Sequence, residues 1–385
     1  MASQFQGKDW ESAFLAQFQA LFSKQAVPSG TKSPFLSLGL EHEFFLEQSP
    51  HTPADHKTGQ RFFTCLIGAG WEPLFEEDPA IGRFITAVFM HSRLGTVRIK
   101  YEHHPHLLEM VTPPCEGVDD LICALSIAWA ASEDAANSAG CFTNHSAFAP
   151  TTADDSSIWS DHNLCRRLRE YRQFSAKQHG GSLSRRLLNF SAEIAATQLH
   201  FGGIPWEEFG DFIAGLYRFE PWLLSCAAAE AATKDVSARE IVARRWNLYR
   251  DALQGYPLVG FPDLEEWSIK SWARAIGQMP MLPTRPDISS SLEIKGKLVG
   301  PDADWPAILA GIRDLQILRP RIFGTVECRA DPALPSLAAI RRQVERRIAA
   351  ATKQSGAIQS EGTFEEVRRL WWSLGERDVE QGLSK

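Results

Sequence analysis

The sequence predicts an α+β protein in which helices cover one face of an antiparallel or mixed β-sheet. Segments with strand-like alternation are separated by very different intervals, and strands and helices do not alternate regularly along the chain. Neither a GxxxxGK loop followed by Ser or Thr nor a GxGxxG loop that opens a helix is present. These observations argue against a doubly wound nucleotide-binding fold. A nucleotide bound by this chain therefore needs metal ions to hold its phosphates.

The most informative segment is Gly39–Leu46, where two acids stand two residues apart in an apolar stretch. A strand turns alternate side chains to opposite faces, so we expect Glu41 and Glu43 on one face and the apolar side chains on the other. Neighbouring carboxylates repel each other and are rarely buried without a cation. The segment is therefore either a solvated strand face or a strand face that binds a divalent metal ion.

Two further segments carry chemically active groups in strand-like surroundings. Glu102 and Glu109 lie seven residues apart, and Glu109 stands in an apolar run that Pro113 ends. Gln198 and His200 alternate in a segment that ends in a glycine pair. For each segment alone, a surface strand is the simpler interpretation.

The last such segment is Phe323–Asp331. Here Glu327, Arg329 and Asp331 alternate, so a strand would put them on one face together with Thr325. Four segments of this kind, each with apolar residues at alternate positions, favour one sheet face lined by carboxylate and imidazole groups.

Periodicity and turn residues predict the remaining elements. The expected helices cover about 9–25, a helix that starts at 62–67 and ends at 68–70, and then 119–139, 206–232, 335–352 and 363–374. The expected strands cover 38–46, 83–90, 95–102 and 107–111, and a loop is expected at 150–161. Neither a Gly/Ser linker nor an internal repeat is present. We therefore expect a single catalytic domain over 1–385, with its core at about 36–335 and a helical C-terminal part at about 336–385.

Composition narrows the class of protein. With 385 residues, of which 44% are hydrophobic and 23% charged, the chain can bury a large core. The net charge of −7 argues against a nucleic-acid partner. The seven cysteines include no CxxC pair, the first residues do not follow the plan of a secretory signal, and no apolar run approaches the roughly 20 residues that span a bilayer. We expect a cytoplasmic protein without a membrane partner.

Together, in order and spacing, GLEHEFFL, the pair Glu102 and Glu109 before TPP, ATQLHFGG and FGTVECRAD resemble the glutamate–cysteine ligase family. The likeness is closer to its bacterial carboxylate–amine ligase branch and covers roughly residues 36–335. The resemblance implies a glutamine-synthetase-like fold, in which a curved, mainly antiparallel sheet forms a funnel-shaped active site covered by helices. It also implies that ATP enters at one end, an amino acid at the other, and Mg²⁺ ions lie between them.

The resemblance also implies roles for particular residues. The family's metal-binding positions match Glu41, Glu43, Glu102, Glu109, His200 and Glu327. Its phosphate-contacting arginine matches Arg329, which with Glu327 forms the expected catalytic pair. Arg245 is the expected contact for a substrate carboxylate. One departure is Glu102, since the family frequently has the shorter Asp there.

These residues suit an ATP- and Mg²⁺-dependent ligase. Such an enzyme phosphorylates a carboxylate, and an amine then displaces phosphate from the acyl phosphate. The resemblance implies the γ-carboxylate of L-glutamate, L-cysteine as the amine, and a role in glutathione biosynthesis. The alternatives are a ligase for another acid or amine, an ATP-independent metallohydrolase, and a catalytically silent binding module. Its partners are small-molecule substrates, and the sequence leaves a homo-oligomer open.

The other notable side chains have structural interpretations. We expect His103–His106 to form a polar loop rather than a transition-metal site, because a proline bends the chain between the histidines. His42 points away from Glu41 and Glu43 and is expected to pack or to support them. Cys328 is expected to be buried and inert.

Overall fold

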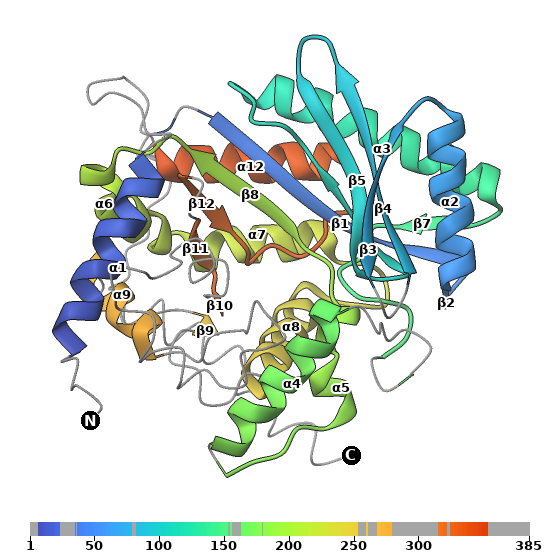
Figure 1. Cartoon of the computed structure of the whole chain (residues 1–385). Helices are drawn as coiled ribbons and strands as arrows, with labels where there is room; N and C mark the ends of the chain where they lie inside the picture. The colour runs from blue at the N-terminus through green and yellow to red at the C-terminus, as the bar shows by residue number, and fades with distance from the viewer. Residues whose placement is uncertain are drawn as a thin grey trace.

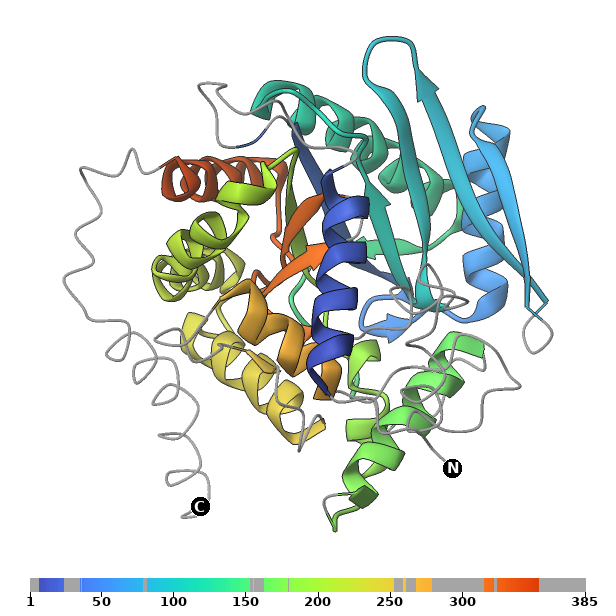
Figure 2. The same ribbon diagram turned by 60° about the vertical axis from the view of Figure 1, so that its left-hand side comes forward.

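The computed structural model describes residues 7–23, 35, 37–78, 82–152, 155, 163–178, 180–252, 259–260, 268–278, 315–321 and 324–352. Within them the chain is an α+β structure built on one large sheet, with helices around it (Figures 1 and 2). The expected helix at 363–374 and most of the expected loop at 150–161 lie outside the described residues.

Ten strands of the described residues form the large sheet, in which every pairing is antiparallel. The strand order is β11-β12-β8-β1-β6-β5-β4-β3, and β2 and β7 also pair with β1. The strands are β1 (Ser37–Ser49), β2 (Thr52–Pro53), β3 (Glu72–Asp78), β4 (Gly82–His91), β5 (Gly95–His104), β6 (Leu107–Val111), β7 (Phe142–Asn144), β8 (Thr197–Gly202), β11 (Leu318–Arg321) and β12 (Thr325–Cys328). A separate parallel pair joins β9 (Val259–Gly260) to β10 (Leu315–Gln316). The mainly antiparallel sheet predicted from sequence is thus confirmed.

The helices of the described residues surround this sheet. They are α1 (Gly7–Phe22), α2 (His56–Gly68), α3 (Val118–Ala139), α4 (Asn163–Gln178), α5 (Arg185–Leu188), α6 (Trp206–Tyr217), α7 (Glu220–Ala231), α8 (Ala238–Ala252), α9 (Ile269–Gln278) and α12 (Leu337–Ala351). Helices α3 and α12 pack side by side, and α3 contacts β1, β5 and β6 (Figure 1). No helix in the described ranges combines the length and apolar character needed to cross a bilayer.

The two faces of β1 differ in what they contact. Its even-numbered side chains from Leu38 to Leu46 are buried, and His42 stacks on Trp129 of α3, with ring centroids 5.2 Å apart. His42 also shares hydrogen bonds of 3.0 Å with Thr197 Oγ1 and with His145 Nδ1. Its predicted packing role is confirmed. Because α3 covers this face, the odd-numbered residues Glu41 and Glu43 point to the opposite face.

Several expected elements are confirmed with changed ends. The strands expected at 83–90, 95–102 and 107–111 are β4, β5 and β6. The helix expected to start at 62 begins at His56, because Asp55 caps it by accepting a 2.8 Å hydrogen bond from the Thr58 amide. The expected leading helix is α1, and that expected at 335–352 is α12.

Two expectations about local structure are wrong. The single helix expected over 206–232 is two helices, α6 and α7, separated at Arg218–Phe219, and Pro221 lies in the first turn of α7. Proline fits a first helical turn but cannot continue the preceding helix. The segment around His104 and His106 is a buried turn rather than a polar loop. The ring of His106 stacks on Phe45, and its Nε2 lies 2.9 Å from the Ala192 carbonyl oxygen.

Candidate functional site

Strand pairing gathers the active groups into rows on the sheet face opposite α3. Glu43 of β1 pairs with Glu109 of β6, and Glu109 pairs with Lys100 of β5. On the other side of β1, His200 of β8 pairs with Glu327 of β12. The segments that alternation predicted to share a face therefore do so, although they are far apart in the sequence.

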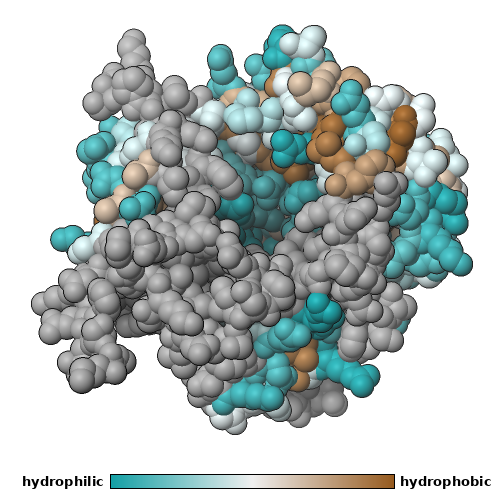
Figure 3. Space-filling view, in the orientation of Figure 1, coloured by the Kyte–Doolittle hydropathy of each residue, from teal (hydrophilic) through white to brown (hydrophobic). Residues whose placement is uncertain are grey.

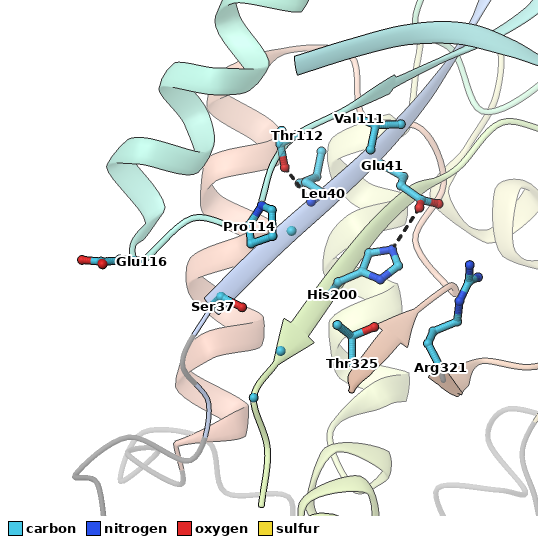
Figure 4. A pocket seen from close by; sticks show the side chains of 13 residues that line it. Ser37, Leu40, Glu41, Val111, Thr112, Pro114, Glu116, His200, Arg321 and Thr325 are labelled. Carbon is cyan, nitrogen blue, oxygen red and sulfur yellow. Dashed lines mark hydrogen bonds and ion pairs between the residues drawn. The ribbon is translucent and has the colours of Figure 1, made fainter. Parts of the chain in front are cut away.

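One group on this face is Glu41, His200 and Glu327, here called the His200 triad. Its potential ligand atoms lie within 4.8 Å of one another. Nε2 of His200 is buried, makes no hydrogen bond within the described residues, and lies 3.5 Å from Glu41 Oε1 (Figure 4). Burial alone would raise the pKa of Glu41, but His200, Lys100 and Arg321 together outweigh it and hold that pKa well below its usual range. An ionised carboxylate beside a buried imidazole nitrogen without a hydrogen bond is a donor set that fits a divalent ion.

Arginines surround one side of the His200 triad. Glu327 Oε2 lies 2.6 Å from Arg321 and 3.9 Å from Arg319, and Glu327 Oε1 lies 3.1 Å from Arg329 Nε. Burial would raise the pKa of Glu327, but these charges, led by Arg329, lower it. Three guanidinium groups around one carboxylate have more hydrogen-bond donors than that carboxylate can accept, and the remaining donors suit a phosphate group.

A second group is Glu43, Glu102 and Glu109, here called the Glu109 triad. Its carboxylate oxygens also approach within 4.8 Å of one another. Burial, followed by the charge of Glu102, raises the pKa of both Glu43 and Glu109. Lys100 Nζ lies 2.5 Å from Glu109 Oε2 and 3.1 Å from Glu102 Oε2. This triad therefore already contains a cation supplied by the chain.

Glu43 has further partners within the chain. Its Oε2 accepts a 2.7 Å hydrogen bond from the Ala196 amide, and its Oε1 accepts a 2.9 Å hydrogen bond from Gln198 Nε2. Glu109 Oε2, like His200 Nε2, makes no hydrogen bond within the described residues, but it lies 2.5 Å from the Lys100 ammonium. Each triad brings its ligand atoms close enough to hold a metal ion, and the two differ in the cations beside them.

A cavity of ≈ 680 Å³ adjoins the His200 triad (Figure 4). Its lining includes Glu41, His200, Arg321, Thr112 and Glu116, and several small residues: Ser37, Gly39, Gly202, Gly203 and Thr325. A Cβ atom on Gly202 would lie 2.5 Å from Ser37 Oγ, so a larger residue there would force the Ser37 hydroxyl to move. On the face seen in Figure 1, the molecule is hollowed near its centre, and the walls of this hollow are hydrophilic (Figure 3). The volume is within the usual range for a small-molecule site.

Arg245 lies apart from the arginines around Glu327. It is buried on α8, and its Nη1 donates a 2.6 Å hydrogen bond to the Ala195 carbonyl, in the segment that leads into β8. Burial lowers the pKa of Arg245. Its contact thus stabilises the backbone next to Glu43, and a role in binding a substrate carboxylate stays a prediction.

Asp331 does not share the face of Glu327, so that expectation is wrong. Strand β12 ends at Cys328, and the alternation of faces ends with it. Asp331 is buried and accepts a 2.7 Å hydrogen bond from Arg347 of α12. Cys328 is fully buried and burial raises its pKa, which confirms the prediction of an inert thiol.

Three cationic residues of the site were not anticipated. Arg319 and Arg321 alternate on β11 and point toward Glu327. The sequence did not predict this strand, because Pro320 lies between the two arginines. Lys100 precedes Glu102 by two residues, which puts both on one strand face. That spacing could have indicated Lys100 as a member of the site, since a lysine two residues before an acid on a strand can pair with it.

Comparisons with known proteins do not assign the chain to a family. No family model matches the chain, and no curated protein matches it. Among solved structures the chain is similar to a bifunctional glutathione synthetase from Pasteurella multocida, with 14% sequence identity and a TM-score of 0.42. The match covers 94% of this chain and 42% of that chain, so this chain spans less than half of that protein's length.

Proposed function

We propose that the protein is an ATP- and Mg²⁺-dependent ligase that joins a carboxylate to an amine. The observation that carries the proposal is the His200 triad, bordered by Arg319, Arg321 and Arg329 and adjoining a cavity of ≈ 680 Å³. A ligand that suits both parts has a negatively charged polyphosphate and a larger organic group. A nucleoside triphosphate is such a ligand.

The residues of the His200 triad would hold the metal ion. Mg²⁺ bound by Glu41, His200 and Glu327 would neutralise charge on the nucleotide's phosphates. The guanidinium of Arg329 would donate hydrogen bonds to the transferring phosphoryl group, as would that of Arg321, which lines the cavity. Gly39 and Gly202 carry only a hydrogen atom in place of a side chain, which would leave room for the rest of the nucleotide.

The reaction then needs no nucleophile from the protein. An oxygen of the substrate carboxylate attacks the γ-phosphorus of ATP, and ADP leaves. The amine nitrogen attacks the carbonyl carbon of the acyl phosphate, phosphate leaves, and the nitrogen loses a proton. Both steps concentrate negative charge where the arginines lie, which is where fixed positive charge lowers the barrier most.

The finer proposals come from the sequence resemblance. They are a glutamine-synthetase-like arrangement of the sheet, the γ-carboxylate of L-glutamate as the acid, L-cysteine as the amine, and a cytoplasmic role in glutathione biosynthesis. Arg245 is proposed to attract the substrate carboxylate through its charge, since it lies close enough to affect the electrostatics of Glu43.

The test is ADP release by the purified chain with ATP, Mg²⁺ and L-glutamate, with and without L-cysteine and other amines, followed together with product mass. ADP release that needs both substrates, with a product at the mass of their condensate, supports the ligase. Release only with another amine keeps the reaction and changes the substrate. A Glu327→Gln variant purified in the same way controls for a contaminating ATPase. No ADP with any pairing, from folded protein, would overturn the proposal in favour of a metallohydrolase or a silent binding module.

A further inference from the structure

The Glu109 triad is arranged around a lysine of the same sheet. Lys100 stands directly across the β5–β6 ladder from Glu109 and two residues before Glu102 on the same strand. Its ammonium lies 2.5 Å from a Glu109 oxygen and 3.1 Å from a Glu102 oxygen. The backbone register therefore places Lys100 and Glu109 at directly opposite positions on the same face of the sheet.

The third member of the triad is also satisfied within the chain. Both oxygens of Glu43 accept hydrogen bonds, one from the Ala196 amide and one from Gln198. Each carboxylate of the Glu109 triad therefore has a partner supplied by the protein. In the His200 triad, the contact of the buried His200 Nε2 with Glu41 is 3.5 Å long, whereas the Lys100 ammonium lies 2.5 Å from Glu109.

A divalent ion and the Lys100 ammonium compete for the same oxygens. Mg²⁺ binds oxygens at about 2.0–2.1 Å in a nearly octahedral shell, and so it needs the space that lies between the carboxylates. The ammonium already contacts two of the carboxylates, so an ion that used the same oxygens would have to displace it. An ion could enter only if Lys100 moved away, which would give up a largely buried ion pair with Glu109, whose side chain is 2% exposed.

We propose that Lys100 is a built-in cation that takes the place of a metal ion in the Glu109 triad, so that, of the two triads, the His200 triad is the one that binds a divalent ion. The proposal rests on the proposed function only for the assignment of the His200 triad as a metal site. The proposal differs from what the sequence resemblance implies, which is that Glu43, Glu102 and Glu109 are metal ligands. In this proposal the three carboxylates instead hold the Lys100 ammonium on the sheet face that carries the site.

The experiment counts Mn²⁺ ions bound by the full chain without nucleotide, by calorimetric titration and by the electron paramagnetic resonance signal of free Mn²⁺. Mn²⁺ is the probe because it accepts the carboxylate ligands that Mg²⁺ accepts. We expect one ion in the wild type, two in Lys100→Met, which removes the charge at nearly constant length, and one in Lys100→Arg. Arg98→Met is the matched control and should bind one ion, because exposed Arg98 lies on the same strand face but pairs with Val111.

Each outcome bears on the proposal. Two ions in the wild type, or no additional ion in Lys100→Met, would overturn it. A double variant, Lys100→Met with Glu102→Gln, should lose the additional ion and so locate it. If Lys100→Met does not fold, anomalous scattering from Mn²⁺-soaked wild-type crystals answers the same question, and a peak among the three carboxylates refutes the proposal.

The same counts separate this proposal from the proposed function. A wild type without any bound ion, together with one ion in Lys100→Met, would contradict a metal in the His200 triad and leave the role of Lys100 intact. No ion in either protein would overturn both. One ion in the wild type and two in the variant, with no ligase activity toward any substrate pair, would support Lys100 and reject the ligase.

Discussion

Glu43 and Glu109 face each other directly across the β1–β6 ladder, and both are buried. Like charges at directly opposite positions destabilise a pair of strands. The structure offsets this repulsion with the Lys100 ammonium on one side and with hydrogen bonds from Ala196 and Gln198 on the other. Of the two triads on this face, the Glu109 triad thus has a lysine among its carboxylates, and the His200 triad is bordered by arginines.

Loss of one carboxylate from the His200 triad should abolish most of the activity and leave the fold intact. We expect Glu41→Gln or Glu327→Gln to lower turnover by more than about 100-fold, because each variant removes a metal ligand rather than core volume. ADP release, with circular dichroism as a check on folding, measures this. Glu345→Gln, on the exposed side of α12, should keep normal turnover. Normal turnover in both triad variants would contradict the metal assignment.

Arg329 should not tolerate replacement by lysine. Its guanidinium offers several donors in a fixed plane, whereas an ammonium is a point charge, so Arg329→Lys should lower turnover by roughly 10- to 100-fold. Steady-state rates at varied ATP concentrations test this, with Arg341→Lys at the exposed pair with Asp119 as the control. Equal rates for the two variants would mean that Arg329 serves only its ion pair with Glu327.

The buried ion-pair network of α12 should dominate local stability. Arg347 is fully buried and contacts Glu220 at 2.6 Å and Asp331 at 2.7 Å. Arg347→Met leaves two buried carboxylates without their cation, and we expect it to lower the free energy of unfolding by about 3–5 kcal/mol. Urea denaturation measures the change. Arg342→Met breaks an exposed pair with Glu230 and should change stability little. A similar loss of stability in both variants would contradict the expectation that the buried pairs of Arg347 stabilise the fold more than the exposed pair of Arg342.

Acid should destabilise the fold through its buried histidines. Burial lowers the pKa of His145 to about 3 and that of His106 to about 4, the latter in spite of a hydrogen bond with the Ala192 carbonyl. The unfolded chain binds these protons near pH 6.5, so between that pH and the folded-state pKa values it holds more protons than the folded chain. The free energy of unfolding should therefore fall as the pH decreases from 6.5, by up to about 1.4 kcal/mol per pH unit for each histidine.

The variant His145→Asn tests the source of this pH dependence. Asparagine can still form a hydrogen bond with His42 but does not titrate, although it loses the stacking of His145 on Trp129. Denaturation at several pH values should give a lower stability for the variant but a shallower dependence on pH. An unchanged slope would assign the acid sensitivity to other groups.

The strand that carries Glu41 and Glu43 could be predicted because alternation is a local signal, and β1 alternates strictly from Leu38 to His42. The division into two triads could not be predicted, since it depends on which residue of a distant strand stands opposite. Arg319 and Arg321 were missed because Pro320 argues against a strand, yet β11 is at the end of the sheet, where a proline is tolerated. Asp331 was misplaced because alternation says nothing about where a strand stops.

The order of strands in the sheet also has a kinetic consequence. Strands β1, β4, β5 and β6 all lie within the first third of the chain and can pair soon after synthesis, whereas the His200 triad waits for β8 and then for β12. Contacts between such distant segments form slowly. Because Lys100 is part of the early meander, the repulsion between Glu43 and Glu109 is relieved before the later strands dock. A nascent chain can therefore form the Glu109 triad well before the strands that complete the His200 triad have been synthesised.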